Sequence, residues 1–169
     1  AYHGLQYQNM GPEDFTPEEW AFAQKRVRIL SAFYGVLKPL DGIQPYRLEF
    51  QCKFRPGGKT LYTYWGDALY RELFSVGEPV VDLASKEYSK GVSRYLKPGD
   101  RMIVCDFLVR RKGRLTTLAT YAKMARGQMV RWMVQQRVDR PEGLQEFTWE
   151  GYRFQPTLSS GERYVFVRE

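Results

Sequence analysis

The segment RMIVCDFLVRRKGRLTTLATYAKMARGQMVRWMVQQR, residues 101–137, decides the fold class of this chain. Two runs with strand character, residues 101–109 and 115–119, flank the turn sequence Arg111-Lys112-Gly113-Arg114, which is the pattern of a β-hairpin. Residues 120–137 then repeat apolar side chains at helical spacing. One face of this helix would carry Tyr121, Ala125, Met129, Trp132 and Met133. A hairpin joined to a long helix predicts an α/β fold.

The flanking sequence extends this prediction in both directions. Thr16, Pro17 and Glu19 form a helix start, so we expect a helix over residues 17–34 that Gly35 ends. The remaining patterns predict helices at residues 62–74 and 85–96, and strands at residues 79–84, 147–154 and 164–167. Residues 36–60 are rich in proline and glycine, which is typical of an irregular binding loop.

The composition fits one folded domain over residues 1–169. Of the 169 residues, 43% are hydrophobic and 15% are aromatic, which is enough to fill a core and excludes disorder of the whole chain. We therefore expect a single α/β domain in which helices flank a mixed sheet.

The charge of the chain points to anionic partners. It has 26 basic and 19 acidic residues and a net charge of +7, which favours nucleic acid, phosphorylated metabolites or a membrane surface. No apolar run is long enough to span a bilayer, so we expect no membrane insertion. His3, Cys52 and Cys105 are too far apart for a metal-ligand pattern, so we expect no metal site and no cofactor.

The first polar cluster lies in a loop stiffened by prolines. It begins at Lys38 and Asp41 and continues to Tyr46, Arg47 and Glu49. In an extended segment the side chains of Arg47 and Glu49 point to the same side. Two interpretations stay open: a structural ion pair, or an arginine that holds an anion and is steered by the carboxylate.

The second cluster combines aromatic rings with a carboxylate. Tyr62, Tyr64, Trp65 and Asp67 lie close together in the sequence. Such rings are able to stack on a base or a sugar, but they are also common in cores, and Trp65 fits the apolar side of the expected helix. Both interpretations stay open, with the core favoured for Trp65.

The third cluster lies on the helix expected at residues 120–137. Lys123, Arg126 and Arg137 occupy the side opposite to the apolar face, where they alternate with Val130 and Val134. A helix face exposed to solvent rarely carries valines among its charged residues, so this pattern indicates a helix that is covered on both sides. Lys123 and Arg126 would then reach into a partly enclosed groove and attract an anion strongly. The alternative is a pair of salt-bridged residues at a rim.

These clusters coincide with a family resemblance. The run RILSAFYGVLKPLD, residues 28–41, continues as IQPYRLE at residues 43–49. Four further matches follow in order: LY and YWGD within residues 61–67, LAS and EY within 83–88, YAK, ARG and M within 121–129, and EGY with F within 150–154. Through these segments the chain resembles the YaaA family of bacterial peroxide-stress proteins over essentially its whole length.

The resemblance implies a cytoplasmic protein that keeps free iron low under hydrogen peroxide and so spares DNA. It also implies a mixed α/β fold with a positively charged cleft, and DNA binding. Family members are longer and begin with a Pro-Ala-Lys-Thr-Leu-Asp motif, so we expect this chain to lack the N-terminal part of the family. Leu108-Val109-Arg110 replaces an acidic stretch of the family, which adds charge suited to an anionic partner.

Two functions follow from these observations. The first is a stress protein that binds double-stranded or branched DNA in a salt-sensitive way. The second is an enzyme of unknown reaction on a small anionic or nucleotide-like ligand, in which Lys123, Glu49 or Tyr46 transfers a proton. Direct iron binding is the weakest interpretation, because the chain has one histidine and scattered carboxylates. The residues expected to bind DNA or the ligand are Lys38, Arg47, Trp65, Asp67, Ser85, Tyr88, Lys123, Arg126 and Arg137.

Overall fold

The computed structural model describes residues 2–169, which fold into two compact units. The first unit joins residues 2–26 with Ile103–Glu169, and the second unit is Val27–Met102. Helices and a mixed sheet are both present, so the α/β class expected from the sequence is confirmed. The expectation of one domain over residues 1–169, and that of a positively charged cleft, stay predictions.

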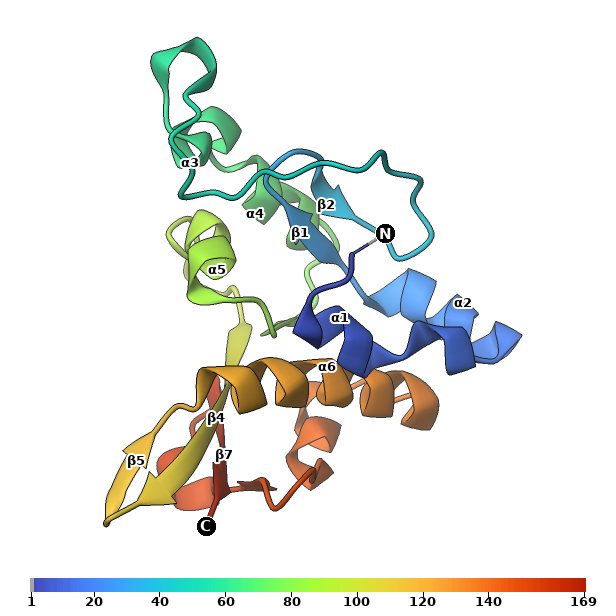
Figure 1. The fold of residues 1–169 in the computed structure, drawn as a ribbon, viewed down its shortest axis with the longest axis vertical. Helices are drawn as coiled ribbons and strands as arrows, with labels where there is room; N and C mark the ends of the chain where they lie inside the picture. The colour runs from blue at the N-terminus through green and yellow to red at the C-terminus, as the bar shows by residue number, and fades with distance from the viewer. Residues whose placement is uncertain (1) are drawn as a thin grey trace. The chain divides into compact units, whose positions relative to one another are not determined.

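The first unit is built on a mixed sheet (Figure 1). Strand β4 (Met102–Arg111) runs parallel to β7 (Arg163–Arg168), with Cys105 opposite Tyr164. Strand β5 (Arg114–Thr116) pairs with β4, and β6 (Arg153–Phe154) pairs with β7, both in the antiparallel sense. This sheet contains the hairpin that the segment at residues 101–119 predicts.

Three helices accompany this sheet: α1 (Leu5–Met10), α2 (Pro17–Arg26) and α6 (Ala119–Gln136). Short 3₁₀ turns lie at Pro12–Asp14, Pro141–Glu146 and Pro156–Leu158. Helix α1 lies alongside α6 (Figure 1). The approach depends on Gly127, since a Cβ atom there would overlap the backbone carbonyl oxygen of Gln6.

Aromatic side chains fill the core of the first unit. Phe107 of β4 stacks on Phe166 of β7, with ring centroids 5.1 Å apart. Phe147 contacts both rings edge-on and also meets Trp132 of α6. Tyr152 is fully buried against Phe107. These contacts fasten α6 and the C-terminal segment to the sheet.

The second unit has shorter elements and longer connections. Strands β1 (Ile29–Ser31) and β2 (Gly35–Leu37) form a small hairpin, and β3 (Val80–Asp82) follows later in the chain. The helices are α3 (Leu61–Trp65), α4 (Ala68–Leu73) and α5 (Lys86–Ser93), with a 3₁₀ turn at Pro56–Gly58. The core of this unit consists of Ala32, Phe50, Leu61, Leu69, Tyr70, Val92 and Met102.

The helix expected at residues 17–34 begins as predicted but ends at Arg26, so its second half was wrong. Residues 29–31 pair instead with residues 35–37 as a hairpin. The turn needs a glycine, because Gly35 has φ of 86° and the ring of Trp65 packs against its Cα. The helical spacing of Leu30 and Tyr34 is a coincidence. The strand pairing of residues 29–31 with residues 35–37 and the contact of Trp65 with Gly35 decide the structure here.

Other boundaries also differ from the sequence prediction. The helix at residues 62–74 is interrupted at Gly66, which has φ of 51° and divides it into α3 and α4. The strand at residues 147–154 is reduced to Arg153–Phe154, because Glu150 and Gly151 adopt positive φ in a tight turn. The helix expected to reach residue 96 ends at Ser93.

Within residues 2–169 the structure has no helix that is both long enough and apolar enough to cross a membrane. The same residues contain no group of three or more histidine, cysteine, aspartate or glutamate side chains arranged to hold a metal ion.

Candidate functional site

Tyr46, in the irregular loop of the second unit, lies against Ser31 at the end of β1. The side chain of Ser31 is fully buried, and its Oγ atom accepts the backbone N–H groups of Phe33 at 3.2 Å and Tyr34 at 2.9 Å. The same atom lies 2.6 Å from the phenol oxygen of Tyr46. A hydroxyl oxygen has two lone pairs, and both are used by the turn. This arrangement favours Ser31 as the donor in its hydrogen bond with Tyr46.

Tyr46 also belongs to an aromatic cluster, which we define as Phe33, Tyr34 and Tyr46. The ring of Tyr46 stacks on Phe33 at 5.3 Å and meets the edge of Tyr34 at 5.6 Å. Phe33 is 55% exposed, which is high for a large apolar side chain. The cluster thus combines an exposed ring with a phenol that Ser31 holds in a fixed position.

Trp65 has a structural role in the same turn. Its indole N–H donates to the backbone carbonyl of Ala32 at 2.9 Å, and its ring covers Gly35. Both contacts fix the β1–β2 hairpin that presents the aromatic cluster. The structure therefore places Trp65 beneath the turn, in agreement with the core interpretation.

Tyr62 and Glu87 form a second polar group in this unit. Tyr62 donates its phenol proton to the backbone carbonyl of Glu87 at 2.6 Å, and the carboxylate of Glu87 accepts the backbone N–H of Gln51 at 3.0 Å. Arg94 lies over the Tyr62 ring, 4.9 Å from its centroid, and Lys90 lies at 5.4 Å. Burial, and then the charge of Glu87, raise the pKa of Tyr62 above its usual value, so it stays neutral.

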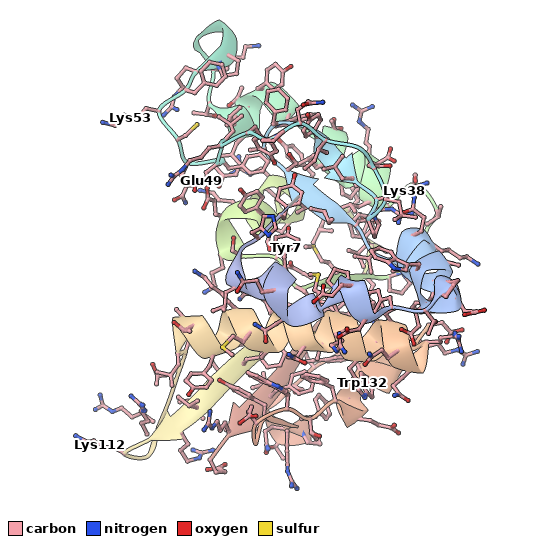
Figure 2. The ribbon with its side chains drawn as sticks, turned by 45° about the vertical axis from the view of Figure 1, so that its right-hand side comes forward. Tyr7, Lys38, Glu49, Lys53, Lys112 and Trp132 are labelled. Carbon is pink, nitrogen blue, oxygen red and sulfur yellow. The ribbon has the colours of Figure 1, made fainter. Side chains whose placement is uncertain are left out.

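The remaining candidates of the second unit do not gather at one point. Lys38 and Glu49 lie at opposite ends of the loop (Figure 2). Arg47 and Glu49 are both exposed, and within the described chain no ion pair joins them. The ion-pair interpretation of these two residues is therefore wrong.

Three more candidates serve the local fold. Asp67, the N-cap residue of α4, accepts from Arg71 at 2.9 Å in an exposed pair four residues apart. Ser85 is the N-cap residue of α5 without a side-chain capping bond. Tyr88 packs edge-on against Phe50, with centroids 5.2 Å apart. None of these contacts identifies a ligand.

Helix α6 carries the three candidates of the first unit. Lys123 and Arg137 are exposed, Arg126 is partly buried, and Arg137 ends the helix in the left-handed conformation with φ of 50°. Val130 and Val134 are buried, so the expectation of a helix covered on both sides is confirmed. The groove expected for Lys123 and Arg126 stays a prediction.

Sequence reasoning missed the residue that fastens the N-terminal segment to α6. Arg131 donates to the backbone carbonyl of Gly11 at 2.8 Å and pairs with Asp14 at 2.9 Å. Gln128, three residues before it, donates to Asn9 at 2.9 Å. Gly127 in the middle of a helix was the available signal, since a helical glycine often marks a close approach.

A half-buried hydrogen-bonded pair and a buried phenol were also missed. The phenol of Tyr70 donates to Asp100 at 2.5 Å, which raises the pKa of Tyr70 and lowers the pKa of Asp100. In the first unit, the phenol of Tyr152 is buried and makes no hydrogen bond with any described residue. Burial raises the pKa of Tyr152, so its phenol stays protonated.

Comparison with known proteins places these residues in a family context. The family model described as "Peroxide stress protein YaaA" matches residues 1–158. A UPF0246 protein of Agathobacter rectalis is 46% identical over 170 aligned residues, covering 100% of this chain and 68% of that protein. UPF0246 proteins of Ligilactobacillus salivarius and Clostridioides difficile are 46% and 43% identical, each over 99% of this chain and 68% of the relative.

Proposed function

Because this chain belongs to the peroxide stress protein family YaaA, we propose that it protects cells from hydrogen peroxide by binding double-stranded DNA. The observation that carries the proposal is a set of exposed cations without a carboxylate partner in the described chain. The candidate residues among those cations are Lys38, Arg47, Lys123 and Arg137.

Such cations keep their attraction for phosphate. A lysine or arginine that neutralises a DNA phosphate releases a condensed counterion, and this release supplies the affinity. Arg71 and Arg163 differ from the set above, since Asp67 and Asp106 hold them at 2.9 Å and 2.6 Å. The chain therefore offers paired and unpaired cations for direct comparison.

The experiment is fluorescence anisotropy of a labelled DNA duplex with the full chain, over a series of salt concentrations. The variant K38Q/K123Q should bind more weakly, and the slope of log affinity against log salt should become shallower by about two. The matched control R71Q/R163Q loses the same charge from paired residues and should change less. Salt-independent binding, or equal losses in both variants, contradicts the proposal.

The proposal extends to iron because free ferrous iron and hydrogen peroxide together generate the radicals that break DNA. A protein that covers the phosphates displaces the cations associated with them, and these include iron. Saturating protein should reduce the nicking of a supercoiled plasmid by ferrous iron and peroxide, and K38Q/K123Q should protect less. Equal nicking of the plasmid with and without the protein contradicts the extension of the proposal to iron.

A second function is favoured by the fixed phenol of Tyr46. The contact with Ser31 fixes the position of this phenol, and Phe33 of the same aromatic cluster is exposed. A tyrosine held in a fixed position at an exposed aromatic cluster suits general acid catalysis. Cells whose own family protein is deleted are supplied with the wild type or a variant and exposed to hydrogen peroxide. Cells that carry Y46F should then not survive, although the DNA affinity of Y46F is unchanged. Cells that carry Y64F, a control at an exposed tyrosine, should survive. Full survival of cells that carry Y46F contradicts the enzymatic function.

A further inference from the structure

The β4–β5 hairpin ends in a tight turn. Lys112 and Gly113 have φ of 50° and 74°, and Arg111 lies opposite Arg114 in the register. A two-residue turn with both φ values positive matches the twist of the flanking strands. The tip of the hairpin is therefore well defined and carries its side chains in a fixed arrangement.

The hairpin extends past the rest of the sheet. The register of β4 with β7 ends at Val109 opposite Arg168. Beyond this point the described strands pair residues 110 and 111 only with β5. Figure 1 shows the two strands continuing away from α6, and Figure 2 shows Lys112 at their end. The structure thus contains a projecting two-stranded ribbon.

The charge of this ribbon has one sign. Arg110, Arg111, Lys112 and Arg114 are all exposed. The sequence from residue 107 to residue 138 contains eight basic residues and no acidic residue. Glu169 pairs with Arg110 at 3.0 Å, and within residues 2–169 the other three cations of the hairpin have no ion pair.

This arrangement costs stability in the free protein. Like charges directly opposite each other on two strands repel, and Arg111 and Arg114 occupy such a pair. Their side chains leave the ribbon on one face, whereas Arg110 and Leu115 occupy the next pair, on the other face. An anion bound between Arg111 and Arg114 would remove the repulsion.

We propose that the β4–β5 hairpin is an arm that enters the major groove of a DNA duplex, with Arg111, Lys112 and Arg114 contacting phosphates and base edges. The inference rests on the DNA binding proposed above and adds where and how the duplex is held. The major groove, about 12 Å wide, accepts a two-stranded ribbon. Arginine forks on one face of the ribbon suit phosphate oxygens and the O6 and N7 atoms of guanine.

The tip of the hairpin argues against a membrane as the partner. Segments that enter a lipid interface present tryptophan, phenylalanine or leucine alongside their cations. Here the turn is Lys112-Gly113, flanked by Arg111 and Arg114. A tip that carries only cations has no apolar side chain to insert into lipid. We therefore infer that the arm binds a polyanion with a groove, such as DNA.

The experiment compares the double variant R111Q/R114Q with K53Q/K59Q in the full chain. Lys53 and Lys59 are also exposed, and they lie in the loop of the second unit. With a labelled 20-base-pair duplex, we expect R111Q/R114Q to weaken binding by about a hundredfold, since each of the two lost contacts costs about tenfold. K53Q/K59Q should change the affinity much less. Methylation of guanine N7 in the duplex should also weaken binding by the wild-type chain.

Thermal unfolding of R111Q/R114Q verifies that it is folded, and the relief of repulsion predicts no loss of stability. The inference is overturned if the wild type binds the duplex and R111Q/R114Q binds equally well, or if K53Q/K59Q loses as much; DNA binding itself then stands. Absence of binding by the wild type instead refutes the proposed function. The same variants are also tested on vesicles containing phosphatidylserine. If R111Q/R114Q loses binding to these vesicles but keeps its affinity for the duplex, the inference is overturned in favour of a membrane.

Discussion

The two units of this chain are held together by different means. In the first unit, long elements bury apolar faces against one another: Phe107 of β4 stacks on Phe166 of β7, and Trp132 of α6 packs against Phe147. In the second unit, the strands have three residues each, and side chains tie the elements to distant backbone. Ser31 closes the 33–34 turn, and Trp65 holds Ala32.

This difference indicates which substitutions should destabilise each unit. A core of packed side chains is sensitive to volume and shape. A turn closed by one buried hydroxyl is sensitive to the loss of a single atom, because the groups bonded to it then lose their shared partner. The following substitutions test the contrast, beginning with the largest effect.

Gly127→Ala should have the largest effect, in the first unit. The added Cβ atom overlaps the backbone oxygen of Gln6, and no change of rotamer relieves an overlap between backbone groups. Overpacking of this kind costs about 3 kcal/mol, and the better helix propensity of alanine returns less than that. Urea unfolding should show the loss, and amide exchange should accelerate in α1 before the other elements.

Gly42→Ala is the matched control, because a Cβ atom there meets nothing within 4 Å and its φ is not positive. It should leave stability unchanged or raise it slightly. If Gly127→Ala were as stable as the wild type, the close packing of α1 on α6 would not hold in solution.

The parts of the fold that were predictable are those with a long, local pattern. Helix α6 and the β4–β5 hairpin lie within a few residues of their expected bounds, because their apolar periodicity extends over many residues. The helix expected to reach Tyr34 was wrong, since the competing hairpin depends on Trp65 packing against Gly35, 30 positions away in the sequence.

The candidate site was less predictable for the same reason. Tyr46 was identified as a site residue, but its partner Ser31 is 15 positions away across a proline-rich turn that has no period. Arg47 and Glu49 were expected to face the same side, which requires an extended strand, and the loop does not provide one. Contacts made through irregular backbone leave no spacing in the sequence that would reveal them.

Ser31→Ala should have the next largest effect, in the second unit. The substitution leaves the N–H groups of Phe33 and Tyr34 and the phenol of Tyr46 without their common partner. We expect a loss of about 2 kcal/mol in the free energy of unfolding. Ser93→Ala, at an exposed position of α5, is the control and should change little. Equal stabilities of the two variants would mean that the Ser31 bonds contribute nothing.

Tyr152→Phe tests the opposite case, a buried hydroxyl without a partner. The phenol oxygen of Tyr152 is buried in the first unit and makes no hydrogen bond within the described chain. Removing an unsatisfied buried polar group should raise the free energy of unfolding by about 1 kcal/mol. Chemical denaturation measures this gain. A loss of stability instead would show that the phenol has a bound water or another partner in solution.

Asp100→Asn should have the smallest effect, and it depends on pH. The hydrogen bond from Tyr70 and the backbone N–H of Lys97 hold the pKa of Asp100 below its usual range. A carboxyl group with a lower pKa in the folded state stabilises the fold above its ordinary pKa, near about 4. This stabilisation is lost as the pH falls through the pKa of the folded state. The difference between wild type and variant in urea midpoint should therefore be largest at neutral pH and shrink in acid. A difference that stays constant over this range would show that the charge of Asp100 does not contribute, and that the second unit gains only shape from this contact.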